Sequence, residues 1–321
     1  MIGVLSSGIA AIPHLETFLG ESWCRVRPWT RPHALSRIAG WGLKPTSLRA
    51  RAYAERHRLP YLALEDGFLR SKGHGGAEPP LSLVLDDIGI YYDANRPSRL
   101  EALVREAAED ASALARGVAL AAAWRAGRVS KYNHQPDVAP EAEGGFALVI
   151  DQTAGDASLI HGRADEASFS RMLEAALDED PHRAVLVKVH PDVLVGRKRG
   201  CIDIAAARRN PRIRVVSDPH HPPALLERAG AVYVVTSQLG FEALVWGVTV
   251  RTFGMPFYAG WGLTADEQSA PERRGRIPFG ALVEAALARY PVYVDPRTGR
   301  QLAPEEAIAA LARSVANMQQ A

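Results

Sequence analysis

Two groups of side chains in the second half of the sequence are suited to binding a phosphate. Lys188 and His190 stand at the end of the apolar run 184–189, on the same side of the strand that this run predicts. Ser237 follows the apolar run 231–235, where a helix is expected to begin with free backbone N–H groups that attract anions. A helix cap would account for Ser237 alone, and a histidine closing a strand would account for His190 alone. The two groups together favour one shared phosphate site.

Two further polar segments carry carboxylates. Asp156 lies in residues 151–158, after a glycine that lets the chain turn sharply, which suits an exposed carboxylate nucleophile or base. It could equally cap the helix that we expect to follow. Glu65 and Asp66 end an earlier apolar run, and Arg70 comes shortly after them. These three residues suit either an acid–base pair with a guanidinium clamp or an exposed turn, and the residues alone do not decide between the two.

Several chemistries find no support in the motifs. The sequence holds no G-x-G-x-x-G opening the first helix, no G-x-x-x-x-G-K-[ST] and no H-E-x-x-H, which argues against a standard dinucleotide oxidoreductase, a P-loop enzyme and a metal centre. Cys24 and Cys201 show no metal-type spacing, so we expect a reducing compartment. No apolar run approaches the roughly 20 residues of a membrane span. We therefore expect a cytoplasmic protein that can lie peripherally at the inner face of the cytoplasmic membrane.

Length and composition set the frame for these sites. The chain has 321 residues, 47% of them hydrophobic and 23% charged, with a formal net charge of +2. At roughly 100–200 residues per domain, this length favours two domains. Only five of the 38 basic residues are lysine, which leaves 33 arginines. The arginine excess indicates a surface for phosphate and carboxylate or, for most of these residues, a codon bias, and the charge balance gives no reason to expect nucleic acid as a partner.

Short apolar runs alternate with amphipathic helices, which predicts an α/β fold with parallel strands. We expect strands over residues 2–5, 61–64, 81–85, 146–150, 184–189, 213–216 and 231–235. We expect helices after residue 8, after a Gly-Trp-Gly turn at 40–42, and over 169–177, 223–228 and 303–318, with one long helix or a pair of helices over 98–127. The polar segment 131–145 predicts the linker between the domains. Because ligands bind beyond the carboxyl ends of parallel strands, the clusters after 150, 189 and 235 should face one crevice.

In this order, the motifs resemble those of the KpsC-type retaining β-Kdo glycosyltransferases of capsular polysaccharide biosynthesis. The matching segments include Glu-Asp-Gly-Phe-Leu-Arg-Ser at 65–71 and Ser-Lys-Tyr-Asn at 130–133. The others are 8–15, 79–84, 87–94, 187–193, 232–244 and 258–264. Family members usually carry two such modules in tandem, and this chain is long enough for one, of the N-terminal type. We therefore expect a truncated form of a two-module protein.

The resemblance implies a GT-B-like architecture of two facing Rossmann-like domains. We expect residues 1–145 to form an acceptor-binding α/β domain and residues 146–295 a donor-binding α/β domain. Residues 296–321 should form a C-terminal helix that packs back on the first domain. The implied donor substrate is CMP-β-Kdo and the implied acceptor is a Kdo-primed glycolipid. No cofactor and no metal are expected.

The resemblance also assigns roles to residues on both sides of the crevice. Six residues are expected at the donor, the first three of them at its phosphate: Lys188, His190, Ser237, Gln152, Gln238 and Glu242. Asp156 corresponds to the nucleophile of a double displacement, which net retention requires. Glu65 is the expected base for the acceptor hydroxyl, with Asp66 as the alternative. Arg70 or another arginine is expected to pair with the Kdo carboxylate.

The expected product extends the Kdo linker on a lysophosphatidylglycerol or phosphatidylglycerol anchor of capsular polysaccharide, through a β-(2→4) linkage. A second transferase module and capsule assembly proteins are the expected protein partners. Two alternatives stay open. A transferase with another activated donor, such as CMP-sialic acid or CDP-glycerol, would use the same kind of phosphate site, although the first-domain motifs favour Kdo. The second alternative is a non-catalytic glycan-binding module. The joint presence of Asp156, Glu65, His190 and Ser237 argues against it.

Overall fold

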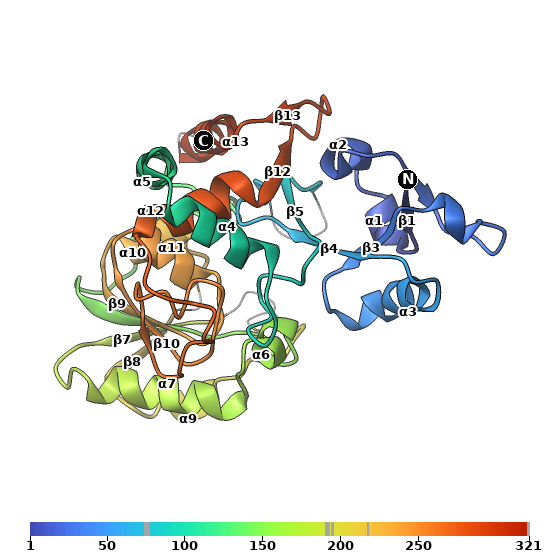
Figure 1. Cartoon of the computed structure of the whole chain (residues 1–321). Helices are drawn as coiled ribbons and strands as arrows, with labels where there is room; N and C mark the ends of the chain where they lie inside the picture. Colours follow the sequence, from blue (N-terminus) through green and yellow to red (C-terminus); the bar gives the residue numbers. More distant parts are fainter. Residues whose placement is uncertain (74–77, 190–192, 194–195, 217, 320–321) are drawn as a thin grey trace.

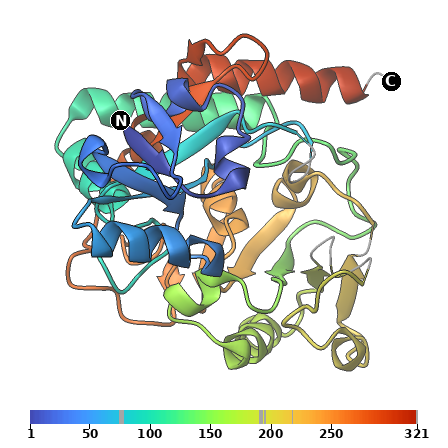
Figure 2. The same cartoon turned by 90° about the vertical axis from the view of Figure 1, so that its right-hand side faces the viewer.

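Two sheets, each flanked by helices, form the two halves of the protein (Figure 1). In this computed structural model the described residues are 1–73, 78–189, 193, 196–216 and 218–319. We call the part built on the first sheet the first domain and the part built on the second sheet the second domain. In Figure 2 the second domain lies below the first, and the C-terminal helix runs along the upper edge. No helix in the described part of the chain is long and apolar enough to cross a bilayer.

The first sheet mixes parallel and antiparallel strands in the order β13-β12-β5-β4-β3-β1-β2. Its strands are β1 (Ile2–Val4), β2 (Trp23–Arg25), β3 (Arg37–Trp41), β4 (Tyr61–Asp66), β5 (Ser82–Asp86), β12 (Pro291–Val294) and β13 (Gln301–Leu302). Strands β2, β1, β3 and β4 are parallel, whereas β5, β12 and β13 run antiparallel to their neighbours. The loops after β1, β3 and β4 therefore leave the sheet at one edge.

The second sheet is parallel throughout, in the order β11-β10-β9-β6-β7-β8. Its strands are β6 (Phe146–Ile150), β7 (Val185–Lys188), β8 (Ile213–Val216), β9 (Ala229–Val234), β10 (Thr249–Thr252) and β11 (Ala265–Asp266). Since β6 lies between β9 and β7, the residues that follow these three strands leave the sheet side by side. This arrangement confirms the expected α/β class with two parallel-rich, GT-B-like domains.

Helices cover both sheets. Those of the first domain are α1 (Ser7–Ala10), α2 (Leu15–Leu19), α3 (Leu48–Arg56), α4 (Arg99–Ala108), α5 (Ala111–Ala126), α12 (Phe279–Glu284) and α13 (Pro304–Gln319). Those of the second are α6 (Ala157–His161), α7 (Glu166–Asp178), α9 (Ile204–Ala207), α10 (Pro222–Leu226) and α11 (Leu239–Val245). Side chains fix where the longer helices begin, because Ser98, Asp110 and Asp165 accept hydrogen bonds from the first-turn N–H groups of α4, α5 and α7.

The chain returns to the first sheet earlier than the sequence predicts. Strand β12 pairs with β5, although we expect the donor domain to extend to residue 295. Helix α12 before it already packs against α4 and α5. The boundary at 295 is therefore corrected to a point before α12. Local periodicity carries no trace of a pairing between segments about 200 residues apart, which is why the sequence pattern places this strand in the wrong domain.

Helices α5 and α12 approach each other closely through two glycines. A Cβ atom on Gly117 would overlap the carbonyl oxygen of Gly280, and one on Gly280 would overlap that of Leu114. The two backbones are therefore in direct contact. This contact fixes α12 and the strand that follows it against the first domain.

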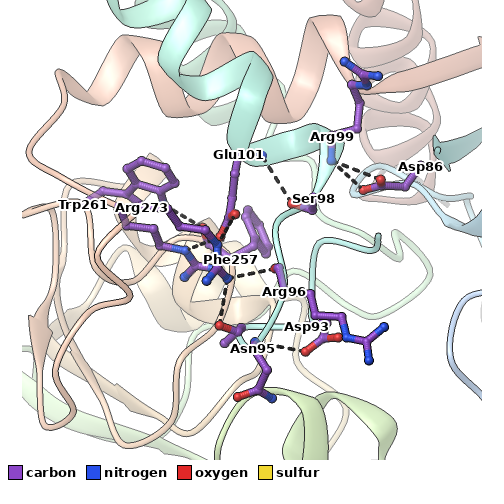
Figure 3. A network of polar contacts seen from close by, with 12 residues as sticks. Asp86, Asp93, Asn95, Arg96, Ser98, Arg99, Glu101, Phe257, Trp261 and Arg273 are labelled. Atoms are coloured by element: carbon purple, nitrogen blue, oxygen red, sulfur yellow. Dashed lines mark hydrogen bonds and ion pairs between the residues drawn. The ribbon is translucent and has the colours of Figure 1, made fainter. Parts of the chain in front are cut away.

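A buried ion cluster joins the first domain to the segment that leads back from the second sheet. Glu101 on α4 accepts hydrogen bonds from Arg273 Nε at 2.6 Å and Arg274 Nε at 2.7 Å. Figure 3 shows Glu101 pointing from its helix toward Arg273, beside Trp261. The Arg274 guanidinium is buried, and one of its nitrogens also donates to the Pro256 carbonyl at 2.8 Å. The cluster therefore ties α4 to the chain next to Phe257, which lines the cavity described below.

The helix contact yields a stability prediction. Alanine is favoured over glycine in a helix by about 1 kcal/mol, yet Gly117→Ala should lower the free energy of unfolding by about 1–3 kcal/mol because a backbone carbonyl has no room to move. Gly275→Ala is the control, since a Cβ there would meet nothing within 4 Å. Urea denaturation of both variants measures the effect. Equal midpoints for the two would contradict the close contact.

Candidate active site

A cavity of about 370 Å³ lies between the two domains, within the size range of small-molecule sites. Most of its second-domain wall is made of residues at the ends of β6 and β7 and after β6, β7 and β9, as the parallel pairing predicts. Its first-domain wall includes Lys44, Glu65, Tyr92 and the segment around Lys131. Charged groups from both domains therefore reach the same space.

Gln152 joins the ends of two neighbouring strands. Its Oε1 accepts a hydrogen bond from the backbone N–H of Thr236 at 2.9 Å, and its Nε2 donates to Thr236 Oγ1 at 3.0 Å. Ser158 Oγ lies 3.0 Å from the same Thr236 hydroxyl. The adjacent Asp151 is turned the other way, accepting from the N–H of Cys201 at 3.0 Å. Gln152 thus builds the floor of the cavity, and Asp151 holds a neighbouring loop.

Lys188 and Ser237 both line the cavity, as expected for a phosphate site. Burial lowers the pKa of the Lys188 ammonium to about 8, although the charge of Glu242 acts in the opposite direction. Ser237 Oγ accepts from the backbone N–H of Leu239 at 3.3 Å, a local turn contact just before helix α11, whose N-cap is Gln238. Its hydroxyl hydrogen can still be donated to a ligand. His190, the third residue expected here, lies outside the described residues.

Glu242 is buried beneath the cavity and bound to the other domain. Its Oε2 accepts from Ser130 Oγ at 2.6 Å, and its Oε1 accepts from the N–H of Lys131 at 3.4 Å. Burial raises the pKa of this carboxyl from its ordinary value of 4.5 to about 7. A second bridge comes from Gln238, whose Nε2 donates to the Phe68 carbonyl at 2.7 Å. Both residues expected at the donor therefore also hold the two domains together.

Asp156 is exposed on the cavity wall and caps helix α6. Its Oδ1 accepts from the N–H of Ser158 at 2.9 Å, so the capping alternative is realised. Gly155 before it has a φ of +79°, a left-handed conformation that glycine adopts without strain. No hydrogen bond to Oδ2 is formed by any residue of the described chain. One carboxylate oxygen thus fixes the side chain while the other remains open to the cavity.

Glu65 is the buried carboxylate of the first-domain wall. Its Oε1 accepts from Lys44 Nζ at 2.8 Å and from the N–H of Asp66 at 3.2 Å. Its Oε2 is buried and has no hydrogen-bond partner within the described residues. A buried carboxylate oxygen without a partner is costly, so this atom is available to bind a ligand hydroxyl or accept a proton.

Asp66 and Arg70 lie outside the cavity lining and pair with each other. Asp66 Oδ2 is 2.9 Å from Arg70 Nε, and Arg70 Nη1 donates to Ser71 Oγ at 2.9 Å. The guanidinium is buried by these contacts. The expected position of Arg70 as a clamp within the crevice is therefore not the one it adopts. Its role is to shape the loop that follows Glu65.

Lysines, and not arginines, are the cations of the cavity, and one of them, Lys44, belongs to none of the motifs identified in the sequence. Lys44, Lys131 and Lys188 line it, and they are three of the five lysines in the chain. None of the 33 arginines belongs to the described lining. In a sequence where arginine is the default cation, the rare lysines were the signal that could have located this site. An ammonium is a compact point charge whose pKa responds to burial, which a guanidinium does not offer.

Comparison with known proteins agrees with this geometry. Residues 36–122 and 113–290 match the family described as capsule polysaccharide biosynthesis protein. The capsule polysaccharide modification protein LipA of Neisseria meningitidis serogroup B is 41% identical over 309 residues, which cover 92% of this chain and 43% of LipA. The lipopolysaccharide-processing protein LpsZ of Rhizobium meliloti is 35% identical, over 91% of this chain and 67% of LpsZ. The chain spans less than half the length of LipA.

Two solved structures from Thermosulfurimonas dismutans are similar over nearly the whole chain. The KpsC β-Kdo 2,4 transferase has a TM-score of 0.89 and 42% identity, with 97% of each chain covered. The KpsC β-Kdo 2,7 transferase has a TM-score of 0.70 and 28% identity, with 98% of each chain covered. The resemblance to the KpsC type that the motifs carry is confirmed.

The buried Glu242 carboxyl predicts how stability depends on pH. Because its pKa is raised by folding, its stabilising effect is complete below pH 4.5 and is lost as the pH rises through about 7. Relative to Glu242→Gln, the wild-type protein should lose about 3 kcal/mol of unfolding free energy between pH 4.5 and 7.5. The pKa of Lys188 also depends on the charge of Glu242, so the measured difference includes this coupling. Urea unfolding at pH 4.5, 6 and 7.5 measures this difference, and a constant difference at the three values would contradict it.

Proposed function

Because the chain belongs to the capsule polysaccharide biosynthesis protein family, we propose that it is a retaining glycosyltransferase that transfers Kdo from CMP-β-Kdo to a Kdo-primed glycolipid acceptor. The observation that carries the proposal is the cavity itself. It brings an open carboxylate from one domain, Asp156, together with a buried carboxylate from the other, Glu65, among three lysines. Two carboxylates with different surroundings are what a double displacement at a sugar requires.

The donor phosphate is proposed to bind at the end of β7. Lys188 supplies a half-buried charge, so an anion beside it gains more than it would at the open surface. Ser237 supplies a hydroxyl donor, and His190, two residues after Lys188 in the sequence, completes the proposed set. The phosphate can then leave without a strong acid, because its charge is already compensated. Lys131 is the cation proposed for the Kdo carboxylate, in place of Arg70.

The proposed reaction proceeds in two displacements. An oxygen of Asp156 attacks the anomeric carbon, the bond to the phosphate breaks, and CMP leaves with the bonding electrons. An ester between Asp156 and Kdo results. Glu65 Oε2 then takes the proton of an acceptor hydroxyl, whose oxygen attacks the anomeric carbon and releases the Asp156 carboxylate. Lys44 holds the other oxygen of Glu65, and Asp66 is disfavoured as the base because it is paired with Arg70.

The linkage and the wider context of the product follow the relatives. The greater similarity to a β-Kdo 2,4 transferase than to a β-Kdo 2,7 transferase favours a β-(2→4) linkage here. The proposed acceptor is the Kdo linker on a lysophosphatidylglycerol or phosphatidylglycerol anchor. A second transferase module is the proposed protein partner.

Replacing Asp156 tests the proposal. Asp156→Asn keeps an amide oxygen that can cap α6, so folding should be retained, while transfer from CMP-Kdo should fall by on the order of a thousandfold or more. Asp203→Asn is the matched control, because Asp203 also caps a second-domain helix, α9, and does not line the cavity. Transfer is measured on a synthetic Kdo acceptor. Near-normal transfer by Asp156→Asn, or loss of transfer in both variants, would contradict the assigned nucleophile.

The intermediate can be observed directly. With CMP-Kdo and no acceptor, a Glu65→Gln variant should accumulate the ester, because the second displacement lacks its base. Mass spectrometry of the digested protein should find Kdo on the peptide that contains Asp156. An adduct on another residue would contradict Asp156 as the nucleophile and assign that role to the modified residue.

A further inference from the structure

A second groove lies on the first domain and has no part in the proposed chemistry. Its walls come from the loop before β5, the turn between β12 and β13, and helix α13. It shares no lining residue with the cavity between the domains. Its volume of about 800 Å³ exceeds that of the cavity and leaves room for more than an ion.

Four basic side chains line the groove, and one of them forms an ion pair with an acidic residue. Lys72, Arg297, Arg300 and Arg313 line it, and Arg300 pairs with Glu306 at 3.0 Å. Across the described chain, the other three form no ion pair within 4.0 Å. Three positive charges are therefore free to meet a ligand. A phosphodiester carries one negative charge that its two non-bridging oxygens share, and both oxygens can accept hydrogen bonds from such cations.

The acidic residues of the groove are already bound to the backbone. Glu78 accepts from the N–H of Gly73 at 2.6 Å, and Asp295 accepts from that of Arg297 at 2.9 Å. Glu306 accepts from the N–H of Ala303 at 2.8 Å in addition to its ion pair. These carboxylates hold turns in place. They keep their negative charges, so the lining carries four cations and three carboxylates, a net charge of +1 that still favours an anion.

Most of the remaining lining of the groove is apolar, with Ser71 and Ser314 as polar exceptions. Leu81, Leu302 and Leu311 line it together with Ala309 and Ala310 of helix α13. An inorganic anion would gain nothing from such a surface, since apolar area stabilises only the burial of hydrocarbon. The groove therefore suits a ligand that joins a negative charge to an apolar chain.

One thin wall separates the groove from the active-site cavity. Ser71 and Tyr132 form a parallel bridge, and the N–H of Asn133 donates to the Lys72 carbonyl at 2.8 Å. Ser71 and Lys72 line the groove, whereas Tyr132 and Lys131 line the cavity. Paired extended segments lie about 5 Å apart. The groove and the cavity therefore lie next to each other on the two sides of this pairing.

We propose that this groove binds the phosphodiester headgroup and the adjoining acyl chain of a glycolipid, while the sugar end of the same molecule lies in the cavity. The identity of that molecule as the acceptor rests on the proposed function. The binding of an acylated phosphodiester does not, because it follows from the charges and the apolar surface of the groove alone. The groove then holds the acceptor by a part that does not react.

Calorimetry with short-chain lipids below their micelle concentration tests the binding. Dihexanoyl phosphatidylglycerol should bind the whole chain, and dihexanoyl phosphatidylcholine and glycerol 3-phosphate should bind at least tenfold more weakly, because the first lacks the net charge and the second the acyl chains. The double variant Arg297→Ala/Arg313→Ala should weaken phosphatidylglycerol binding about thirtyfold, at about 1 kcal/mol for each charge. The matched control is Arg208→Ala/Arg209→Ala, two exposed arginines of the second domain, which should bind like the wild type.

Transfer assays separate this inference from the proposed function. The double variant should raise KM for an acylated, phosphate-linked Kdo acceptor and leave transfer to a lipid-free Kdo acceptor unchanged. Absence of phosphatidylglycerol binding to the wild type, or equal binding by the double variant and the control, would overturn the groove as a lipid site. Equal loss of transfer to both acceptors would overturn it as well. If the wild type transfers Kdo to neither acceptor, the proposed function fails, and the calorimetry still decides the lipid site.

Discussion

The buried contact of Glu101 with two arginines is the constraint on which the shape of the active site depends. Lys44 and Glu65 belong to one domain and Asp156 and Lys188 to the other, so the cavity exists only while the domains keep their relative position. A buried ion cluster adds little net stability when complete, because desolvation offsets attraction, but removing one partner leaves an uncompensated charge at a cost of about 3–5 kcal/mol. The intact cluster therefore adds little to the net stability of the fold. Moving α4 away from the two arginines would nevertheless carry a large energetic cost.

Two hydrogen bonds between the domains, close to the cavity, also hold the domains in their relative position. Glu242 accepts a hydrogen bond from Ser130, and Gln238 donates one to the Phe68 carbonyl. Both lie beside the proposed donor site, so a change of domain position would alter the donor pocket directly. Two charged groups nearby are withdrawn from solvent, and this burial lowers the pKa of Lys188 and raises that of Glu242. An arriving phosphate restores to Lys188 part of the stabilisation that burial removed.

The sequence predicted the second domain better than the first, for a physical reason. Apolar runs buried in a parallel sheet are followed by polar loops, so the positions of Gln152, Lys188 and Ser237 at one edge could be inferred from pattern alone. The strand Arg37–Trp41 was hidden, because the glycine and tryptophan that we expect in a turn lie within it and only Gly42, with a φ of +40°, turns the chain. Strand β12 was hidden because its partner is distant in the sequence.

The candidate site divides in the same way. The identity of Glu65 as a cavity carboxylate could be predicted, but its lysine partner could not, since Lys44 lies on a different loop and belongs to none of the motifs identified in the sequence. Arg70 has the right chemistry for a carboxylate clamp, and a neighbour four residues away, Asp66, takes it instead. Which of two ion-pair partners an arginine meets depends on the path of the loop. The path of the loop cannot be predicted from residue types alone.

The central claim is that the cavity between the domains holds the donor nucleotide at the end of β7. A crystal structure of the protein with CMP tests it most directly. The account predicts the CMP phosphate within hydrogen-bond distance of Lys188 Nζ and Ser237 Oγ, with the open oxygen of Asp156 facing the space beside that phosphate. CMP bound elsewhere, or bound in the cavity with its phosphate turned away from Lys188 and Asp156, would contradict the account.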